Sequence, residues 1–257
     1  MKLSACIEFL FAAECPDFAE RIRASQRAGL DAVEFHLWRD KPLDAVRAAL
    51  DETGLPLSAI VVEPRCRLAD PSAHAGFFQA VKETLATARR LGAQYVIPSV
   101  GPVLTGVPLA TQREAIVAAL SGAVQLAGDA GVNLLLEPIN SAVDHPGMYL
   151  TSTTEGLDIV ERIGSANLRL LYDIYHSVTM GETPENLFAG REHLLGYVQV
   201  ADSPGRHEPG SGNIDWTRYL RLLDALGYQG VIGLEYRPLR DTLGSLQSTR
   251  RSLGLSA

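Results

Sequence analysis

The fold class of this 257-residue chain is decided by the stretch Asn133-Leu-Leu-Leu-Glu-Pro-Ile-Asn140. Residues 134–136 are apolar without alternation, which is typical of a parallel strand covered on both faces. Gly131 precedes the stretch, and the segment 111–130 before that glycine has the apolar periodicity of a helix. A glycine at this position favours a helix C-cap. The stretch therefore predicts a helix, a glycine turn and a buried parallel strand that ends at a carboxylate.

The same unit recurs along the chain. Short β-rich runs predict strands at residues 3–10, 32–37, 57–62, 95–100, 133–137, 169–173, 196–200 and 231–235. Helical periodicity alternates with them at residues 17–28, 42–53, 72–91, 111–130, 153–163, 184–193, 215–226 and 242–253. Eight such units predict an α/β fold, a single (β/α)8 TIM barrel that forms one domain over residues 1–257. A doubly wound sheet is disfavoured, because no G-x-G-x-x-G motif follows the first strand.

Charge and hydropathy argue against two classes of partner. The chain has 23 Lys and Arg against 30 Asp and Glu, a formal net charge of −7. This field repels phosphate backbones, so no nucleic-acid partner is expected. No membrane segment is expected either, because no apolar run approaches about 18 residues. The N-terminal apolar segment contains Glu8 and is interpreted as structure rather than as a cleaved signal.

Three cysteines, Cys6, Cys15 and Cys66, form an odd set without C-x-x-C spacing. This pattern argues against a disulfide framework and a zinc–thiolate site, and it fits a cytoplasmic location. We expect each thiol to be a buried or incidental side chain, and none to be a nucleophile. A homo-oligomer fits this class of barrel, although no segment of the sequence identifies its surface.

Four polar residues fall at the carboxyl ends of consecutive predicted strands: Glu137, Asp173, Gln199 and Glu235. The active site of a (β/α)8 barrel lies at these ends, so the four side chains are expected to converge. Three carboxylates at close range raise one another's pKa values unless a cation neutralises them. Oxygen ligands without imidazole or thiolate suit Mg²⁺ or Mn²⁺ better than zinc. The sequence therefore predicts a divalent metal site.

The same region carries a resemblance to a known family. Its motifs are Leu136-Glu-Pro-Ile-Asn140, Asp144-His-Pro-Gly147, Tyr172-Asp-Ile-Tyr-His176, Val198-Gln-Val-Ala-Asp202, Arg206-His-Glu-Pro-Gly-Ser-Gly-Asn-Ile-Asp215 and Gly233-Leu-Glu-Tyr236. In order and spacing they resemble the hydroxypyruvate isomerase-like family of the xylose isomerase-like TIM-barrel superfamily, a group of sugar isomerases and epimerases. The resemblance implies that the four strand-end residues are the metal ligands. It also implies that Glu137 and Glu235 are the catalytic pair that moves protons.

The resemblance further points to substrate-binding residues. His176 resembles the family's contact to a substrate hydroxyl, and Arg206 resembles the residue that binds the polar substrate. An anionic substrate needs such a cation near its carboxylate. Glu34, at the end of the second predicted strand, is a further candidate for substrate binding. Gln199 favours the hydroxypyruvate isomerase side, since ketose 3-epimerases of the superfamily usually have histidine there.

The first half of the chain departs from the family pattern. Cys6-Ile-Glu8 stands where the family has an Asn-Leu-Ser-like triplet, and Pro64-Arg-Cys-Arg67 stands where it has Gly-Asp-Trp. Glu34-Phe-His-Leu-Trp38 replaces a Phe-Pro-Tyr-like sequence. Because these loops help to shape the pocket, the substrate is less determined than the metal chemistry.

We therefore expect a metal-dependent isomerase of a small hydroxy-keto acid or sugar. The leading substrate is hydroxypyruvate, converted to tartronate semialdehyde by aldose–ketose isomerisation through an enediolate. Alternatives on the same barrel are a ketose 3-epimerase, a 2-oxo-tetronate isomerase or an inosose-type enzyme. A DNA-repair endonuclease would need a histidine-rich zinc cluster and a basic face, which this sequence does not supply. A non-catalytic sugar-binding barrel is disfavoured by the presence of both Glu137 and Glu235.

Overall fold

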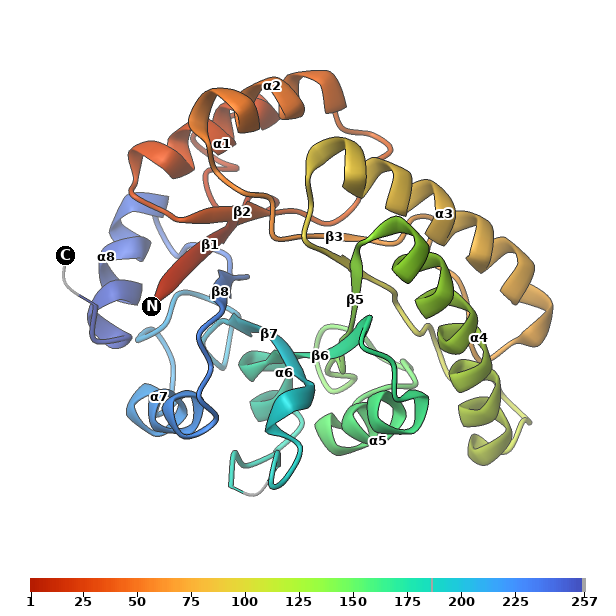
Figure 1. Cartoon of the computed structure of the whole chain (residues 1–257). Helices are drawn as coiled ribbons and strands as arrows, with labels where there is room; N and C mark the ends of the chain where they lie inside the picture. Colours follow the sequence, from red (N-terminus) through yellow and green to blue (C-terminus); the bar gives the residue numbers. More distant parts are fainter. Residues whose placement is uncertain (186, 256–257) are drawn as a thin grey trace.

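The computed structural model describes residues 1–185 and 187–255, and eight parallel strands of this part form one sheet. The strands are β1 (Lys2–Cys6), β2 (Ala32–Glu34), β3 (Ala59–Val61), β4 (Tyr95–Ile97), β5 (Asn133–Leu136), β6 (Leu168–Asp173), β7 (Leu195–Val200) and β8 (Val231–Leu234). Their order around the sheet is β2, β1, β8, β7, β6, β5, β4, β3. The two ends of this order meet where Ser58 N donates to Val33 O at 2.7 Å. The closed sheet, ringed by helices (Figure 1), confirms the predicted (β/α)8 architecture.

Helices cover the outside of the barrel (Figure 1). They are α1 (Phe18–Arg27), α2 (Leu43–Thr53), α3 (His74–Leu91), α4 (Leu109–Ala130), α5 (Thr153–Ile163), α6 (Ile174–Thr179), α7 (Trp216–Ala225) and α8 (Thr242–Ser252), with short 3₁₀ helices η1 (Pro71–Ala73) and η2 (Glu192–Leu194). Gly131 ends α4 in the left-handed conformation that glycine adopts without strain, as predicted. Within the described residues, no helix is long and apolar enough to cross a membrane.

The sixth helix differs from its prediction. The described residues between 184 and 193 form turns and η2 instead of a helix, and residue 186 lies outside the described residues. Helix α6 begins directly after β6 because Asp173 caps it. Its Oδ1 accepts hydrogen bonds from Tyr175 N at 2.8 Å and from His176 N at 3.3 Å. The prediction of a helix over 184–193 is therefore wrong, since the cap starts the helix ten residues earlier than the apolar pattern indicates.

The first strand is shorter than predicted. β1 ends at Cys6, and residues 7–14 form turns. Arg21 of α1 holds these turns, since its guanidinium donates to Ile7 O and to Cys15 O, both at 2.9 Å. The segment is therefore a loop at the carboxyl end of the barrel, where it supplies Phe9 to a cavity described below.

Strand side chains separate into two layers, because successive residues of a strand point to opposite faces. One small apolar cluster consists of strand residues alone: Ala59, Val61, Ile97, Leu135, Leu171 and Tyr197. Neighbouring strand residues such as Ile60 and Leu134 belong instead to the large core shared with the helices. The first cluster fills part of the barrel interior, and the polar chemistry is left to the ends of the strands.

Candidate active site

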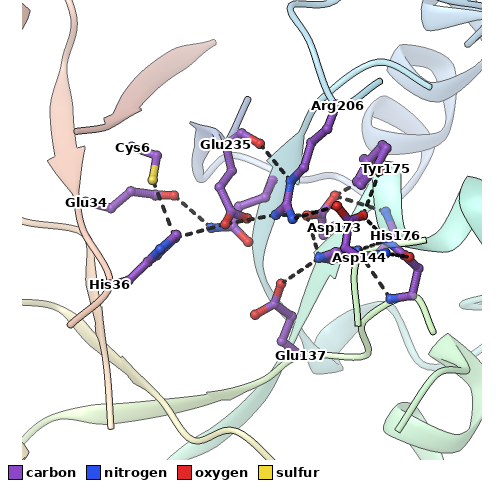
Figure 2. A network of polar contacts seen from close by, with 12 residues as sticks. Cys6, Glu34, His36, Glu137, Asp144, Asp173, Tyr175, His176, Arg206 and Glu235 are labelled. Carbon is purple, nitrogen blue, oxygen red and sulfur yellow. Dashed lines mark hydrogen bonds and ion pairs between the residues drawn. The ribbon is translucent and has the colours of Figure 1, made fainter. Parts of the chain in front are cut away.

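The four predicted ligands lie at the carboxyl ends of β5 to β8, and Figure 2 shows three of them, Glu137, Asp173 and Glu235. Asp173 is the last residue of β6 and pairs with Gln199 of β7, which pairs in turn with Gly233 of β8. Glu137 directly follows β5, and Glu235 directly follows β8. This register of the parallel strands delivers the polar side chains to the same edge of the sheet.

Three of these residues carry a buried oxygen without a hydrogen-bond partner among the described residues: Asp173 Oδ2, Gln199 Oε1 and Glu235 Oε2. Their exposed fractions are only 2%, 3% and 6%. Each unsatisfied buried oxygen costs about 1–3 kcal/mol. Three unpartnered oxygens at one end of the barrel indicate that a further group binds there. A divalent cation that takes oxygen ligands would interact favourably with all three. The donor set therefore fits a divalent metal ion.

Glu34, the last residue of β2, contacts Gln199, and neither residue lines the cavity described below. Its Oε1 accepts a hydrogen bond from Gln199 Nε2 at 2.7 Å, and its Oε2 accepts one from the Tyr197 hydroxyl. Burial raises the pKa of Glu34 to about 7, against the lowering effect of these two hydrogen bonds. Because Glu34 holds the amide nitrogen of Gln199, the amide oxygen is left as the acceptor for a cation.

His176 is a buried residue of α6 whose ring is oriented by Asn140. The backbone N–H of Asn140 donates to His176 Nδ1 at 3.2 Å, which assigns the ring proton to Nε2. Nε2 lies 3.8 Å from Glu137 Oε1 and 3.6 Å from Asp173 Oδ2. Burial and the charge of Arg206 lower the pKa of His176 to about 3, so the ring is neutral. The structure thus brings His176 to the predicted ligands as a neutral N–H donor.

Arg206 reaches the cluster from the loop after β7. Its Nη2 lies 2.9 Å from Glu235 Oε1 and 3.9 Å from Asp173 Oδ2, and its side chain is 7% exposed. The backbone is in the left-handed region, with φ of 56°, so the loop turns sharply at this residue. The guanidinium is therefore already paired inside the site and is not a free cation.

The charges of the cluster push the pKa values of its carboxyls apart. Burial, together with the charges of Glu235 and Asp173, raises the pKa of Glu137 well above its ordinary value. Burial and Glu235 raise the pKa of Asp173 to about 7. Burial acts on Glu235 in the same direction, but Arg206 and a hydrogen bond from His36 outweigh it and hold the pKa of Glu235 well below its usual range. Burial is the largest cause of both raised pKa values, and repulsion between the carboxylates adds to it. A bound cation relieves this repulsion.

Asp202 fixes the loop that carries Arg206, and its place in the sequence gives little sign of this role. The side chain is fully buried, and its carboxylate accepts hydrogen bonds from Ser203 N, Gly210 N, Ile214 N and the Trp216 indole N–H. The backbone of Arg206 donates to Asp202 O at 3.0 Å. These donors lie at separate positions along the chain up to α7. Only the folded loop therefore shows that they all bind to one carboxylate.

Two further residues complete the polar network (Figure 2). Asp144 accepts hydrogen bonds from the Tyr175 hydroxyl and from Asn140 Nδ2, both at 2.7 Å. His36 Nε2 lies 2.9 Å from Glu235 Oε1. Asp144 belongs to a recognisable motif, whereas His36 is marked only by its place near the end of the second predicted strand.

A cavity of about 480 Å³ adjoins the cluster. Its lining includes the predicted site residues Glu137, His176, Arg206 and Glu235 and three further arginines, Arg65, Arg67 and Arg237. The three further arginines are exposed, and their guanidinium groups form no hydrogen bond or ion pair with any residue that the structure describes. The cavity therefore has a carboxylate-rich side and cationic groups that remain free to bind an anion.

The barrel and the carboxylates at its strand ends define the class of α/β-barrel enzymes whose polar site lies at the carboxyl end of the sheet. The chain belongs to the xylose isomerase-like TIM barrel family, whose model matches residues 22–253. The resemblance drawn from the sequence motifs is thereby confirmed.

Individual relatives are similar over nearly their whole length. The chain is 32% identical to the putative hydroxypyruvate isomerase of Xenopus laevis, over 96% of this chain and 94% of that protein. It is 31% identical to the 2-oxo-tetronate isomerase of Cupriavidus necator, over 92% and 94%. The solved structure of an AP endonuclease, family 2, from Brucella melitensis superposes with a TM-score of 0.88 at 25% identity, over 95% of this chain and 96% of that one. The chain is an enzyme of the isomerase and epimerase type.

Proposed function

We propose that this enzyme isomerises a small α-hydroxycarbonyl acid, with hydroxypyruvate converted to tartronate semialdehyde as the leading reaction. The observation that carries the proposal is the set of unpartnered buried oxygens on Asp173, Gln199 and Glu235 beside two cavity-lining glutamates. The relatives named hydroxypyruvate isomerase and 2-oxo-tetronate isomerase support the same class of substrate.

Glu137, Asp173, Gln199 and Glu235 would hold a divalent ion, Mg²⁺ or Mn²⁺ in keeping with their oxygen donors. When bound, such an ion supplies Lewis-acid stabilisation of the negative charge that develops on the substrate oxygens. His176 directs its Nε2 proton toward the same side of the site, 3.8 Å from Glu137 Oε1. It is thereby placed to donate a hydrogen bond to a substrate oxygen.

Glu137 and Glu235 carry out the proton transfer. One carboxylate removes a proton from the CH₂OH carbon, and the electron pair of that C–H bond forms the enediolate double bond. A proton returned to the former ketone carbon completes tartronate semialdehyde, while the hydroxyl proton moves between the two oxygens. The two glutamates follow β5 and β8, separate strands of the barrel, so they approach the substrate from different strand ends. Return of the proton to the original carbon from the other side would instead give an epimerase.

The charged groups of the cavity favour an acid as substrate. Arg206 was expected to bind the carboxylate of the substrate, but its charge is neutralised by Glu235. We therefore assign this role to the arginines that have no ion-pair partner among the described residues: Arg65, Arg67 and Arg237. Within the site, Arg206 orients Glu235 and balances the carboxylate charge. Glu34, expected to touch the substrate, is here assigned to holding Gln199.

The cavity volume favours 2-oxo-tetronate as a second candidate substrate. About 480 Å³ is within the range of sites for small organic ligands and leaves room for more than a three-carbon acid. A four-carbon acid would also reach further toward the arginines that line the cavity.

Proton NMR in D₂O with Mg²⁺ and each acid tests the proposal. We expect loss of the hydroxypyruvate CH₂ signal with formation of tartronate semialdehyde, and a drop of at least about a thousandfold in Glu137→Gln and Glu235→Gln, since each removes a proton carrier. Glu114→Gln, on the exposed face of α4, is the matched control and should leave turnover intact. Unchanged spectra with both acids, while ketohexoses or inososes turn over, would move the function to an epimerase or inosose-type enzyme.

A further inference from the structure

A second cluster of ligand-type side chains lies beside the proposed catalytic site, on the other side of Glu235 (Figure 2). Cys6 is the last residue of β1, His36 follows β2, and Glu235 follows β8. These strands are neighbours in the barrel, in the order β2, β1, β8. The ligand atoms of the three side chains all lie within 4.8 Å of one another.

The contacts converge on one atom of the histidine. His36 Nε2 lies 3.5 Å from Cys6 Sγ and 2.9 Å from Glu235 Oε1. A nucleophile relay of the cysteine–histidine–carboxylate type needs the thiol on one ring nitrogen and the carboxylate on the other. Here both partners approach the same nitrogen, so the geometry excludes that relay. Three ligand-type atoms within 4.8 Å of one another are instead close enough to bind one ion together.

The spacing and chemistry fit a thiophilic ion. Tetrahedral zinc with Zn–S of about 2.3 Å and Zn–N of about 2.0 Å places sulfur and nitrogen roughly 3.5 Å apart, and the observed distance is 3.5 Å. The same geometry places nitrogen and a carboxylate oxygen roughly 3.3 Å apart. His36 Nε2 and Glu235 Oε1 are hydrogen-bonded at 2.9 Å, so this pair must separate slightly when the ion enters. Sulfur and imidazole ligands favour zinc-like ions, whereas the oxygen set of β5 to β8 favours harder ones. Glu235 Oε1 is shared by Arg206 and His36, whereas Oε2 is buried and unpartnered among the described residues, so the carboxylate keeps one oxygen free to bind a cation.

We propose that Cys6 Sγ, His36 Nε2 and Glu235 Oε1 form a binding site for a thiophilic divalent ion such as Zn²⁺, separate from the oxygen site but sharing Glu235 with it. As the ion binds, the thiol proton of Cys6 leaves to solvent, and the ring proton of His36 moves from Nε2 to Nδ1 so that the Nε2 lone pair can bind the ion. Cys6 is fully buried, but His36 lines the cavity and gives the ion a route of entry. An ion at this site competes with Arg206 for Glu235 Oε1, so thiophilic metals inhibit the enzyme.

Cobalt(II) titration of the chelator-treated full chain tests the site without any assay of activity. Co²⁺ bound to a thiolate gives an intense near-ultraviolet sulfur-to-metal charge-transfer band, which oxygen and nitrogen ligands do not produce. We expect this band in the wild type and in Cys66→Ser, and its loss in Cys6→Ser. Cys66 is the matched control because it also lines the cavity, with its sulfur hydrogen-bonded to Pro64 O.

Two results would overturn the proposal: a wild type without the band at saturating Co²⁺, or a band that survives in Cys6→Ser. Circular dichroism verifies the fold of Cys6→Ser, and His36→Gln provides an independent check that leaves the thiol in place. That variant should weaken Co²⁺ binding, followed through the same band, at least about tenfold through loss of one ligand. Equal affinity in His36→Gln would also contradict the site. Neither spectroscopic result depends on whether the proposed isomerase substrate is right.

Discussion

Gln199 owes its orientation to two residues that never touch the cavity. Glu34 accepts the hydrogen bond from its amide nitrogen, and Gly233 leaves the space in which they meet. A Cβ at position 233 would lie 2.7 Å from Glu34 Oε2 and 2.9 Å from Gln199 Cγ. A side chain at this point of β8 would therefore push the two residues apart, which explains the glycine in Gly233-Leu-Glu-Tyr236.

Glu34→Gln tests the positioning role. Tyr197 and Gln199 donate to different oxygens of Glu34. The substituted amide replaces one of these oxygens with an NH₂ donor, so either Tyr197 or Gln199 loses its acceptor. We expect the affinity for Mn²⁺, measured by isothermal titration calorimetry, to fall about 10–100-fold, as for other residues that orient a metal ligand. Glu155→Gln is the control, because Glu155 also accepts from a tyrosine hydroxyl, that of Tyr149, but lies on α5. Equal affinities of Glu34→Gln and wild type would refute the role.

At the scale of elements, Asp173 has two roles at the junction between β6 and α6. Asp173 uses Oδ1 to cap α6 and keeps Oδ2 unpartnered for the site. Apolar periodicity does not reveal a helix that starts on the last residue of a strand, and this is why the helix expected at 184–193 is wrong. The strand-end position of Asp173 was nevertheless predictable, because it follows from the βα repeat.

The loop between β7 and α7 is predicted to depend on Asp202. Asp202→Ala leaves several buried donors without an acceptor, each at a cost of about 1–3 kcal/mol. We therefore expect the free energy of unfolding, measured by urea denaturation, to fall by at least about 3 kcal/mol. Asp215→Ala, which removes only the exposed cap of α7, should cost about 1 kcal/mol. If both variants lost the same small amount, Asp202 would not be the centre of the loop.

The loop between β3 and η1 is predicted to bind the anionic end of the substrate. Gly101, with φ of 91°, lets this loop pack closely, since a Cβ there would lie 2.9 Å from Cys66 O. We expect Arg65→Ala/Arg67→Ala to raise KM for the acid substrate about 10–100-fold with little change in kcat, because hydrogen bonds to a charged group are lost. Steady-state kinetics measure this, and the exposed Arg251→Ala of α8 is the control. An unchanged KM would show that the carboxylate binds elsewhere.

At the scale of the whole molecule, a divalent ion at the strand ends would join β5, β6, β7 and β8, and should stabilise the barrel. At a concentration of about 100 times Kd it adds about 2.7 kcal/mol to the free energy of unfolding. For a chain of this size we expect Mg²⁺ or Mn²⁺ to raise Tm by about 5–10 °C in differential scanning calorimetry, reversed by a chelator.

The matched variants for this measurement are Glu235→Gln and Glu114→Gln. The first removes a proposed ligand and should lose most of the shift, whereas the second removes a surface carboxylate and should keep it. A shift of the same size in both would place the stabilising ion outside the proposed site.

The barrel could be predicted from the sequence, because the βα repeat and the buried parallel strands leave few other ways to cover the apolar faces. The sequence also determined which residues stand at the strand ends, so the convergence of Glu137, Asp173, Gln199 and Glu235 could be predicted. The hydrogen-bond and ion-pair partners of these groups, by contrast, are visible only in the folded chain. Closure of the sheet sets β1 between β8 and β2, and this brings Cys6 and His36 close to Glu235, which lies near the other end of the chain. Such pairings depend on side-chain distances between strands remote in sequence, which no local pattern encodes.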